Sequence, residues 1–261
     1  MPLSKVKAKD ALAKRHERNI SAFFRQQKTL VIRALNRRSL SAPKGKAREL
    51  ESPPFNMAPE VWDKIWGEVV KQSTGQLKAV ITAAEADGLH AGADQFGLAF
   101  QGPTPTGSTF NLANPRAVSW FQQNGGSVDY IAGIQETTGN QIKTIIEAGI
   151  TEGKSYTQVA KEISQTFDEF SKDRARLIAI TEIGKAYEEG NMNFAQSLKD
   201  AGITMVKRWE TSKDDKVSDG CQENEDEDFI PIDQYHRSGD QQPPRFPGCR
   251  CYESYEQKQG D

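Results

Sequence analysis

The sequence predicts a mainly α protein: a helical body followed by a small α+β module with short antiparallel strands and long loops near the C-terminus. Up to about residue 200, apolar side chains recur at helix-like spacings between proline- and glycine-rich breaks. After residue 204, short alternating runs are separated by acidic and proline-rich loops. A hydrophobic content of 36% in 261 residues is low for one compact globule, which favours additional polar or extended segments.

Capping residues help to locate the helices. Asn114 before Pro115 is typical of a helix start, and Ser155 with Gln158 forms the pattern of a capping box. Gly88 and Gly202 are expected helix stops. The expected helices cover 11–39, 58–88, a short segment from 115 to the glycines at 125–126, 127–150, a segment from 155 through Phe167, and 172–200.

Loops and strands follow from proline, glycine and alternation. Residues 41–55 are expected to be a linker and 101–110 a loop. Strands are expected at 204–212, 229–233 and 250–256, with an acidic loop between the first two. No apolar run approaches the roughly 20 residues of a membrane-spanning helix, and the basic N-terminus lacks the apolar region of a signal peptide, so neither is expected.

Charge is distributed unevenly along the chain. Residues 1–48 contain fourteen lysines and arginines against two acids, Asp10 and Glu17, whereas the remainder is acidic. A basic helical arm on an acidic body suggests contact with nucleic acid or an acidic protein; a solvated helix is the equally weighted alternative. The candidate contact residues are Lys14, Arg15, Arg18, Arg25, Lys28, Arg33, Arg37 and Arg38.

The three cysteines are Cys221, Cys249 and Cys251, the last two flanking Arg250. So few thiols do not form a disulfide framework, which fits a reducing compartment. Three soft ligands with His236 as a fourth would suit a structural zinc ion, although the paired spacing of zinc ribbons is absent. The alternatives are buried apolar thiols, a disulfide, or a catalytic thiol with a histidine base.

The segment "RARLIAITE" (174–182) is the other dense cluster of polar residues. Arg174 and Thr181 fall near one helix face, and Glu182 is within reach of neighbouring turns. An anion-binding or catalytic pair is one interpretation, and ion pairs that fix helix packing are the favoured one. Trp209, on the first expected strand, is assigned to the core.

Five segments, taken in order, resemble the tailed-phage head morphogenesis family, the minor head proteins similar to phage Mu protein F. They lie within residues 110–255, over half the chain, and residues 1–100 match less clearly. The segments are "FNLANPRAVSWF" (110–121), "IAGIQETTGNQIKTIIEAGITEGKSYTQVAKEI" (131–163), "RARLIAITEIGKAYEEGN" (174–191), "KRWETSKDDKVSDGCQENE" (207–225) and "PPRFPGCRC" (243–251).

Charge and helical spacing suggest a basic helical arm (1–48) and a helical segment with linkers (49–109). The resemblance implies the family domain (110–261), which contains the strand and loop module (204–261). It also implies a departure from the family pattern in the cysteine-rich motifs. Ser218 stands where the family has a further cysteine, and Phe246 stands where it has a histidine. Two metal ligands are therefore missing, unless His236 substitutes.

The function implied is that of a minor capsid protein without enzymatic activity. Its expected partners are the portal protein and the major capsid or scaffolding protein, with nonspecific double-stranded DNA at the basic arm and no membrane. It would lie in the virion, at the head interior or portal vertex, and in the host cytoplasm during assembly. The alternative is a metal-dependent nuclease or toxin-like effector that uses the cysteines, His236 and the acidic loop. A regulatory DNA-binding protein is disfavoured because no reader motif is evident.

Overall fold

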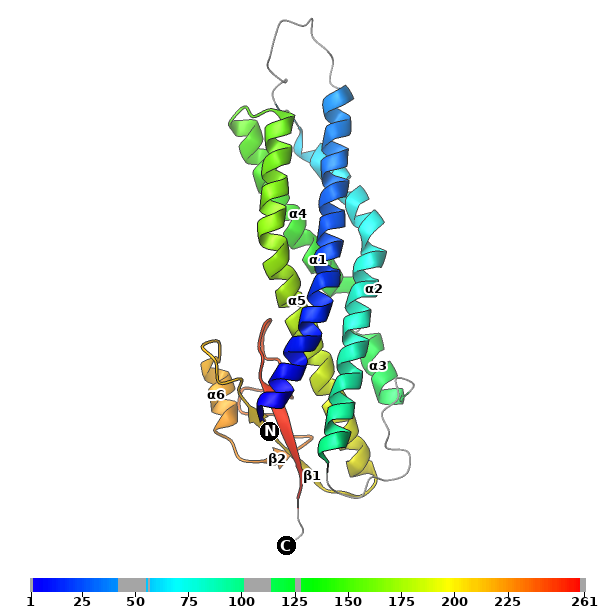
Figure 1. Cartoon of the computed structure of the whole chain (residues 1–261), viewed down its shortest axis with the longest axis vertical. Helices are drawn as coiled ribbons and strands as arrows, with labels where there is room; N and C mark the ends of the chain where they lie inside the picture. Colours follow the sequence, from blue (N-terminus) through cyan, green and yellow to red (C-terminus); the bar gives the residue numbers. More distant parts are fainter. Residues whose placement is uncertain (1, 42–54, 56, 101–113, 125–127, 259–261) are drawn as a thin grey trace, which may run out of the picture. The chain divides into compact units, whose positions relative to one another are not determined.

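The computed structural model describes residues 2–41, 55, 57–100, 114–124 and 128–258, and shows long helices followed by a small antiparallel sheet (Figure 1). The predicted fold class is confirmed. The chain separates into two compact units, each assembled from distant segments. The first unit contains residues 1–18, 80–125 and 176–261, and the second contains 19–79 and 126–175. The expected linker and loop at 41–55 and 101–110 lie almost entirely outside the described residues.

The helical body has five helices within the described residues. Two of the expected starts are confirmed by their caps. The Asn114 side chain accepts a hydrogen bond from the Arg116 N–H, and Ser155 and Gln158 exchange the two bonds of a capping box. The helices are α1 (Pro2–Ser41), α2 (Pro59–Ala99), α3 (Pro115–Asn124), α4 (Val128–Thr151) and α5 (Tyr156–Asp200).

The expectation that Gly88 ends a helix is wrong, since α2 continues to Ala99. Glycines at the contact between α2 and α5 serve helix packing instead. A Cβ on Gly92 would lie 1.9 Å from the Tyr187 carbonyl oxygen, and one on Gly190 would lie 2.2 Å from the Leu89 carbonyl oxygen. Within the first unit, α2 and α5 therefore approach more closely than any side chain at these two positions permits.

The expectation of two helices on either side of residue 170 is also wrong. A single helix, α5, runs from Tyr156 to Asp200. The sequence between Phe167 and Lys172 holds no proline or glycine, so nothing interrupts the backbone hydrogen bonds. Within the second unit, Phe170 of this helix packs edge-on against Phe24 of α1, with ring centroids 6.5 Å apart.

The sheet forms the C-terminal part of the first unit. Its strands are β1 (Met205–Glu210), β2 (Ile230–Pro231) and β3 (Tyr252–Gln257), in the order β2-β1-β3, and both pairings are antiparallel. The three expected strands are found, the middle one shorter than predicted. The acidic segment is not entirely a loop, because it contains α6 (Asp219–Glu225), a helix the sequence analysis missed.

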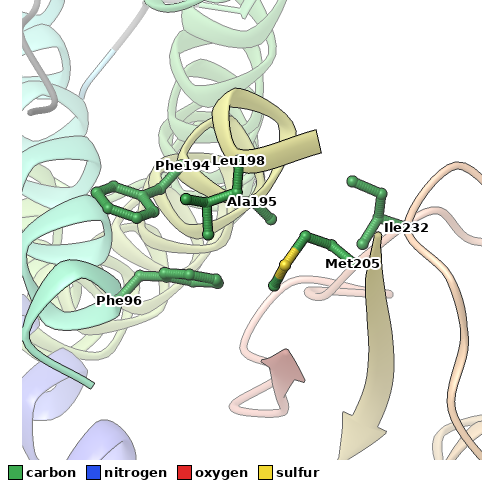
Figure 2. Close-up of a cluster of buried hydrophobic side chains, with 6 residues drawn as sticks. All are labelled: Phe96, Phe194, Ala195, Leu198, Met205 and Ile232. Carbon is green, nitrogen blue, oxygen red and sulfur yellow. The ribbon is translucent and has the colours of Figure 1, made fainter. Parts of the chain in front are cut away.

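An apolar cluster joins the ends of α2 and α5 to this sheet, as Figure 2 shows. Phe96 and Phe194 face one another with ring centroids 5.0 Å apart. Met205 enters the same cluster from the start of β1, and Ile232 from just after β2. The sheet is thereby held to the helices of its own unit. None of the described helices is long and apolar enough to cross a membrane.

Candidate functional site: the C-terminal module

The three cysteines meet at one corner of the C-terminal module, defined here as residues 205–257. Cys221 comes from α6, and Cys249 and Cys251 come from the loop that enters β3. Their sulfur atoms all lie within 4.8 Å of one another, and the Sγ atoms of Cys221 and Cys249 are 4.0 Å apart. All three thiols are free and buried, packed with Trp209. The structure therefore gathers every thiol of the chain into a single cluster.

Hydrogen bonds distinguish one sulfur of this cysteine cluster from the other two. A bond from the Cys251 thiol, supported by the backbone N–H groups of Cys251 and Arg245, lowers the pKa of the Cys249 thiol to about 6 against the opposing effect of burial. Donating that bond raises the pKa of Cys251, and burial raises the pKa of Cys221. Among the three thiols, Cys249 is therefore the one whose thiolate form the surroundings favour.

His236 does not belong to the cysteine cluster. Its Nδ1 lies 2.9 Å from a Glu227 oxygen, and its Nε2 lies 3.0 Å from a Glu253 oxygen. Both ring nitrogens of His236 therefore lie within hydrogen-bonding distance of a carboxylate. With both nitrogens directed at carboxylates, the ring packs edge-on against Trp209 and presents no free ligand atom to the thiols.

His236 instead belongs to a buried network of charged side chains within the first unit. Glu253 also lies 3.5 Å from the Lys207 ammonium, and both side chains are fully buried. Burial lowers the pKa of Lys207, against the opposing charge of Glu253. Lys9, near the start of α1, donates to Glu188 at 2.7 Å and to the Cys251 carbonyl oxygen at 2.6 Å. The start of α1 therefore contacts the C-terminal module directly and helps to stabilise it.

Two further contacts fix the loop that carries Cys249 and Cys251. Arg250, between them, donates to Asp10 at 2.6 Å and to Asp214 at 2.7 Å. The Thr181 hydroxyl of α5 accepts a hydrogen bond from the Gly248 N–H at 3.0 Å. Arg250 and the Gly248 backbone thus attach this loop to α1 and α5, while the three thiols lie against one another.

The "RARLIAITE" residues take structural positions. In the second unit, Arg174 donates to the Thr138 hydroxyl and the Ile134 carbonyl oxygen, at 2.8 and 3.1 Å. In the first unit, Glu182 accepts an ion pair from Lys185 at 3.1 Å. Trp209 is fully buried, as expected. These contacts agree with the favoured interpretation, in which the segment fixes helix packing.

The basic residues of α1 fall into two groups. Arg15 pairs with Asp87 and Lys28 pairs with Asp168, so part of the positive charge is used within each unit. The Arg38 side chain lies outside the described residues. The other candidates are exposed, and no ion pair joins them to any other side chain that the structure describes: Lys14, Arg18, Arg25, Arg33 and Arg37.

These features define a class of protein: a helical protein with a small sheet module that is stabilised by buried ion pairs and carries a cysteine cluster. Its family is given by comparison. Residues 140–253, which include the second half of α4, all of α5 and the module as far as the start of β3, match the family described as Phage Mu protein F like protein. This stretch of the chain is therefore similar to the phage Mu protein F-like domain, whose family description points to phage head morphogenesis. No curated protein and no solved structure matches the chain.

The residues that sequence analysis missed are the acids and lysines of the buried network. Lys9, Glu188 and Glu253 sit among many other charged residues, and their partners are 179 and 242 residues apart in sequence. One signal was present. In "RCYESYE", alternation on a strand places Glu253 on the same face as Tyr255 and opposite Tyr252. The structure has the Tyr255 hydroxyl donating a hydrogen bond to Glu253.

Proposed function

We propose that the chain is a minor head protein of a tailed phage or prophage that acts with the portal and the inner capsid surface during head assembly. The observation that carries this proposal is the family match over 140–253. The buried position of His236, with both ring nitrogens bonded to carboxylates, is the second support. The nuclease alternative would need this ring to face a substrate.

Exposed basic side chains on α1 form a surface to which an acidic partner can bind. In the first unit, Lys7, Lys14 and Arg18 are exposed. At 100° per residue they fall within an arc of about 40° on the helix, so they form one basic face. The two acids in the described part of α1, Asp10 and Glu17, lie about 60° and 80° from Lys7 around the helix, outside that arc.

The second unit has a basic groove of its own between α1 and α2. Arg33 and Arg37 line it from α1 and Lys64 lines it from α2, with Glu68 as the opposing acid. Three cations against one anion favour a polyanionic occupant. Packaged double-stranded DNA is the occupant we propose, because phosphate contacts need no sequence recognition.

Portal association is tested by co-purification. The tagged chain is expressed together with the portal and coat proteins of its own phage, and the portal is expected to elute with it. A matched control is the same chain with the family domain disrupted at its core, for example Trp209→Ala. If the wild-type chain is recovered with no more portal or coat protein than the Trp209→Ala control, the proposal is contradicted.

The DNA contact is tested by the salt dependence of binding to a random duplex. Each lost phosphate contact reduces the slope of log K against log salt by about 0.9, so R33Q/R37Q is expected to lower it by about 1.8. The control K71Q/K78Q removes the same charge from exposed positions of α2 outside the groove. Equal slopes for the two double variants would show that net charge, rather than the groove, binds DNA.

A further inference from the structure

The cysteine cluster has dimensions that suit a metal ion better than a disulfide. A disulfide holds its sulfurs about 2.05 Å apart, whereas the Sγ atoms of Cys221 and Cys249 are 4.0 Å apart. Thiolates bound to zinc at about 2.3 Å lie about 3.8 Å apart in tetrahedral geometry and about 4.0 Å apart in trigonal geometry. The observed Cys221–Cys249 separation therefore matches one edge of such a metal site.

The surroundings of the cluster also favour a bound cation. The three thiols come from two segments, α6 and the loop entering β3. Ser218 caps the first segment, and hydrogen bonds to Thr181 and Asp214 hold the second. Ser218 caps α6 and accepts a bond from the Cys221 N–H at 3.3 Å, which fixes the first ligand. Such outer contacts orient sulfur ligands toward a metal.

We infer that Cys221, Cys249 and Cys251 bind one thiophilic d¹⁰ ion, Zn²⁺ in our test, through three protein thiolates. Among the described residues, no histidine or carboxylate joins the group whose ligand atoms lie within 4.8 Å of one another. The apolar side chains of Val217 and Phe246 pack beside it. The fourth position is then taken by a ligand that the described residues do not supply, and His236 takes no part.

The role of the ion is structural. It would join α6 to the start of β3 across 28 residues of chain, in a corner whose apolar core consists of Trp209, the cysteines and two partly buried neighbours. Metal binding contributes folding free energy in modules with so little core. This inference rests on the cluster alone and not on the proposed role in head assembly.

The test uses the full chain, purified under reducing conditions without chelators. Metal analysis with thiol counting is expected to give about one zinc per chain and three protected thiols. After removal of the metal, titration with Zn²⁺ is expected to saturate at one equivalent. Cys249→Ser is expected to weaken binding by about 100-fold or more, since even second-shell changes cost 10–100-fold. His236→Gln is expected to keep the stoichiometry.

A second measurement keeps the inference testable if the cysteine variants fail to fold. Cd²⁺ added to the wild-type chain produces thiolate-to-metal charge-transfer absorbance in proportion to the number of bound thiolates, and three are expected. The inference is overturned if the reduced wild-type chain binds no Zn²⁺ or Cd²⁺. It is also overturned if the folded chain has a Cys221–Cys249 disulfide, or if His236→Gln loses metal while remaining folded.

Discussion

Lys9 offers the sharpest test of how the C-terminal module is stabilised. Its side chain is 7% exposed, and its ammonium group lies 2.7 Å from Glu188, whose side chain is completely buried. Lys9→Met keeps a similar apolar volume and removes the charge, which leaves the Glu188 carboxylate without its cationic partner. Breaking a buried ion pair in this way costs about 3–5 kcal/mol. At about 2–4 °C per kcal/mol for a chain of this size, the melting temperature should fall by roughly 10 °C.

The matched control is Lys14→Met on the same helix. Lys14 is exposed and no ion pair joins it to another described residue, so its free energy of unfolding should change by no more than about 0.5 kcal/mol. Urea denaturation measures the stability of both variants. Hydrogen exchange of peptides within 205–257 locates the effect, because Lys9 also holds the Cys251 carbonyl oxygen.

A double variant separates the lost pair from a simple loss of packing. Lys9→Met with Glu188→Gln removes the unpaired charge, so it should recover part of the stability lost in Lys9→Met alone. If Lys9→Met is as stable as Lys14→Met, or if exchange in 205–257 is unchanged, then α1 is not part of the module's foundation and our account of the network is wrong.

Two further predictions concern helix packing and pH. Gly92→Ala should destabilise the protein by about 1–3 kcal/mol in urea denaturation, because the new methyl group meets the Tyr187 carbonyl oxygen at 1.9 Å. The control Gly67→Ala, where nothing lies within 4 Å, should stabilise it by about 1 kcal/mol. Equal effects of the two substitutions would contradict the close approach of α2 and α5. Burial raises the pKa of Glu189 against a hydrogen bond from Gln242, so its contribution to stability is present at low pH and lost as pH rises through that raised pKa. The free energy of unfolding of Glu189→Gln relative to wild type should therefore increase from acid to neutral pH, and parallel stability curves would refute this.

The fold class followed from sequence because the helical spacings and the later alternation are local patterns. Asn114 and the Ser155–Gln158 pair were also predictable, since a cap is read within four residues. Gly88 was misassigned because a helix stop and a close helix contact both require glycine, and only the partner helix distinguishes them. The break expected before Lys172 had no proline or glycine to cause it.

The candidate site was predicted in part. The sequence analysis named the three cysteines as candidate ligands. Their convergence depends on the register of β1 with β3 and on the position of α6, and the sequence indicated neither. His236 was grouped with them by position in the chain. Its actual partners, Glu227 and Glu253, are acids in an acid-rich region, where no local pattern selects one carboxylate over another.

The central claim is that this chain is a component of phage heads. Quantitative mass spectrometry of procapsids and mature heads, purified by sedimentation from cells that produce the phage, tests it directly. Our account predicts that the chain sediments with the particles at a fixed number of copies, far fewer than the coat protein. If the chain is absent from procapsids and mature heads alike while it is abundant in the same cells, the account is contradicted.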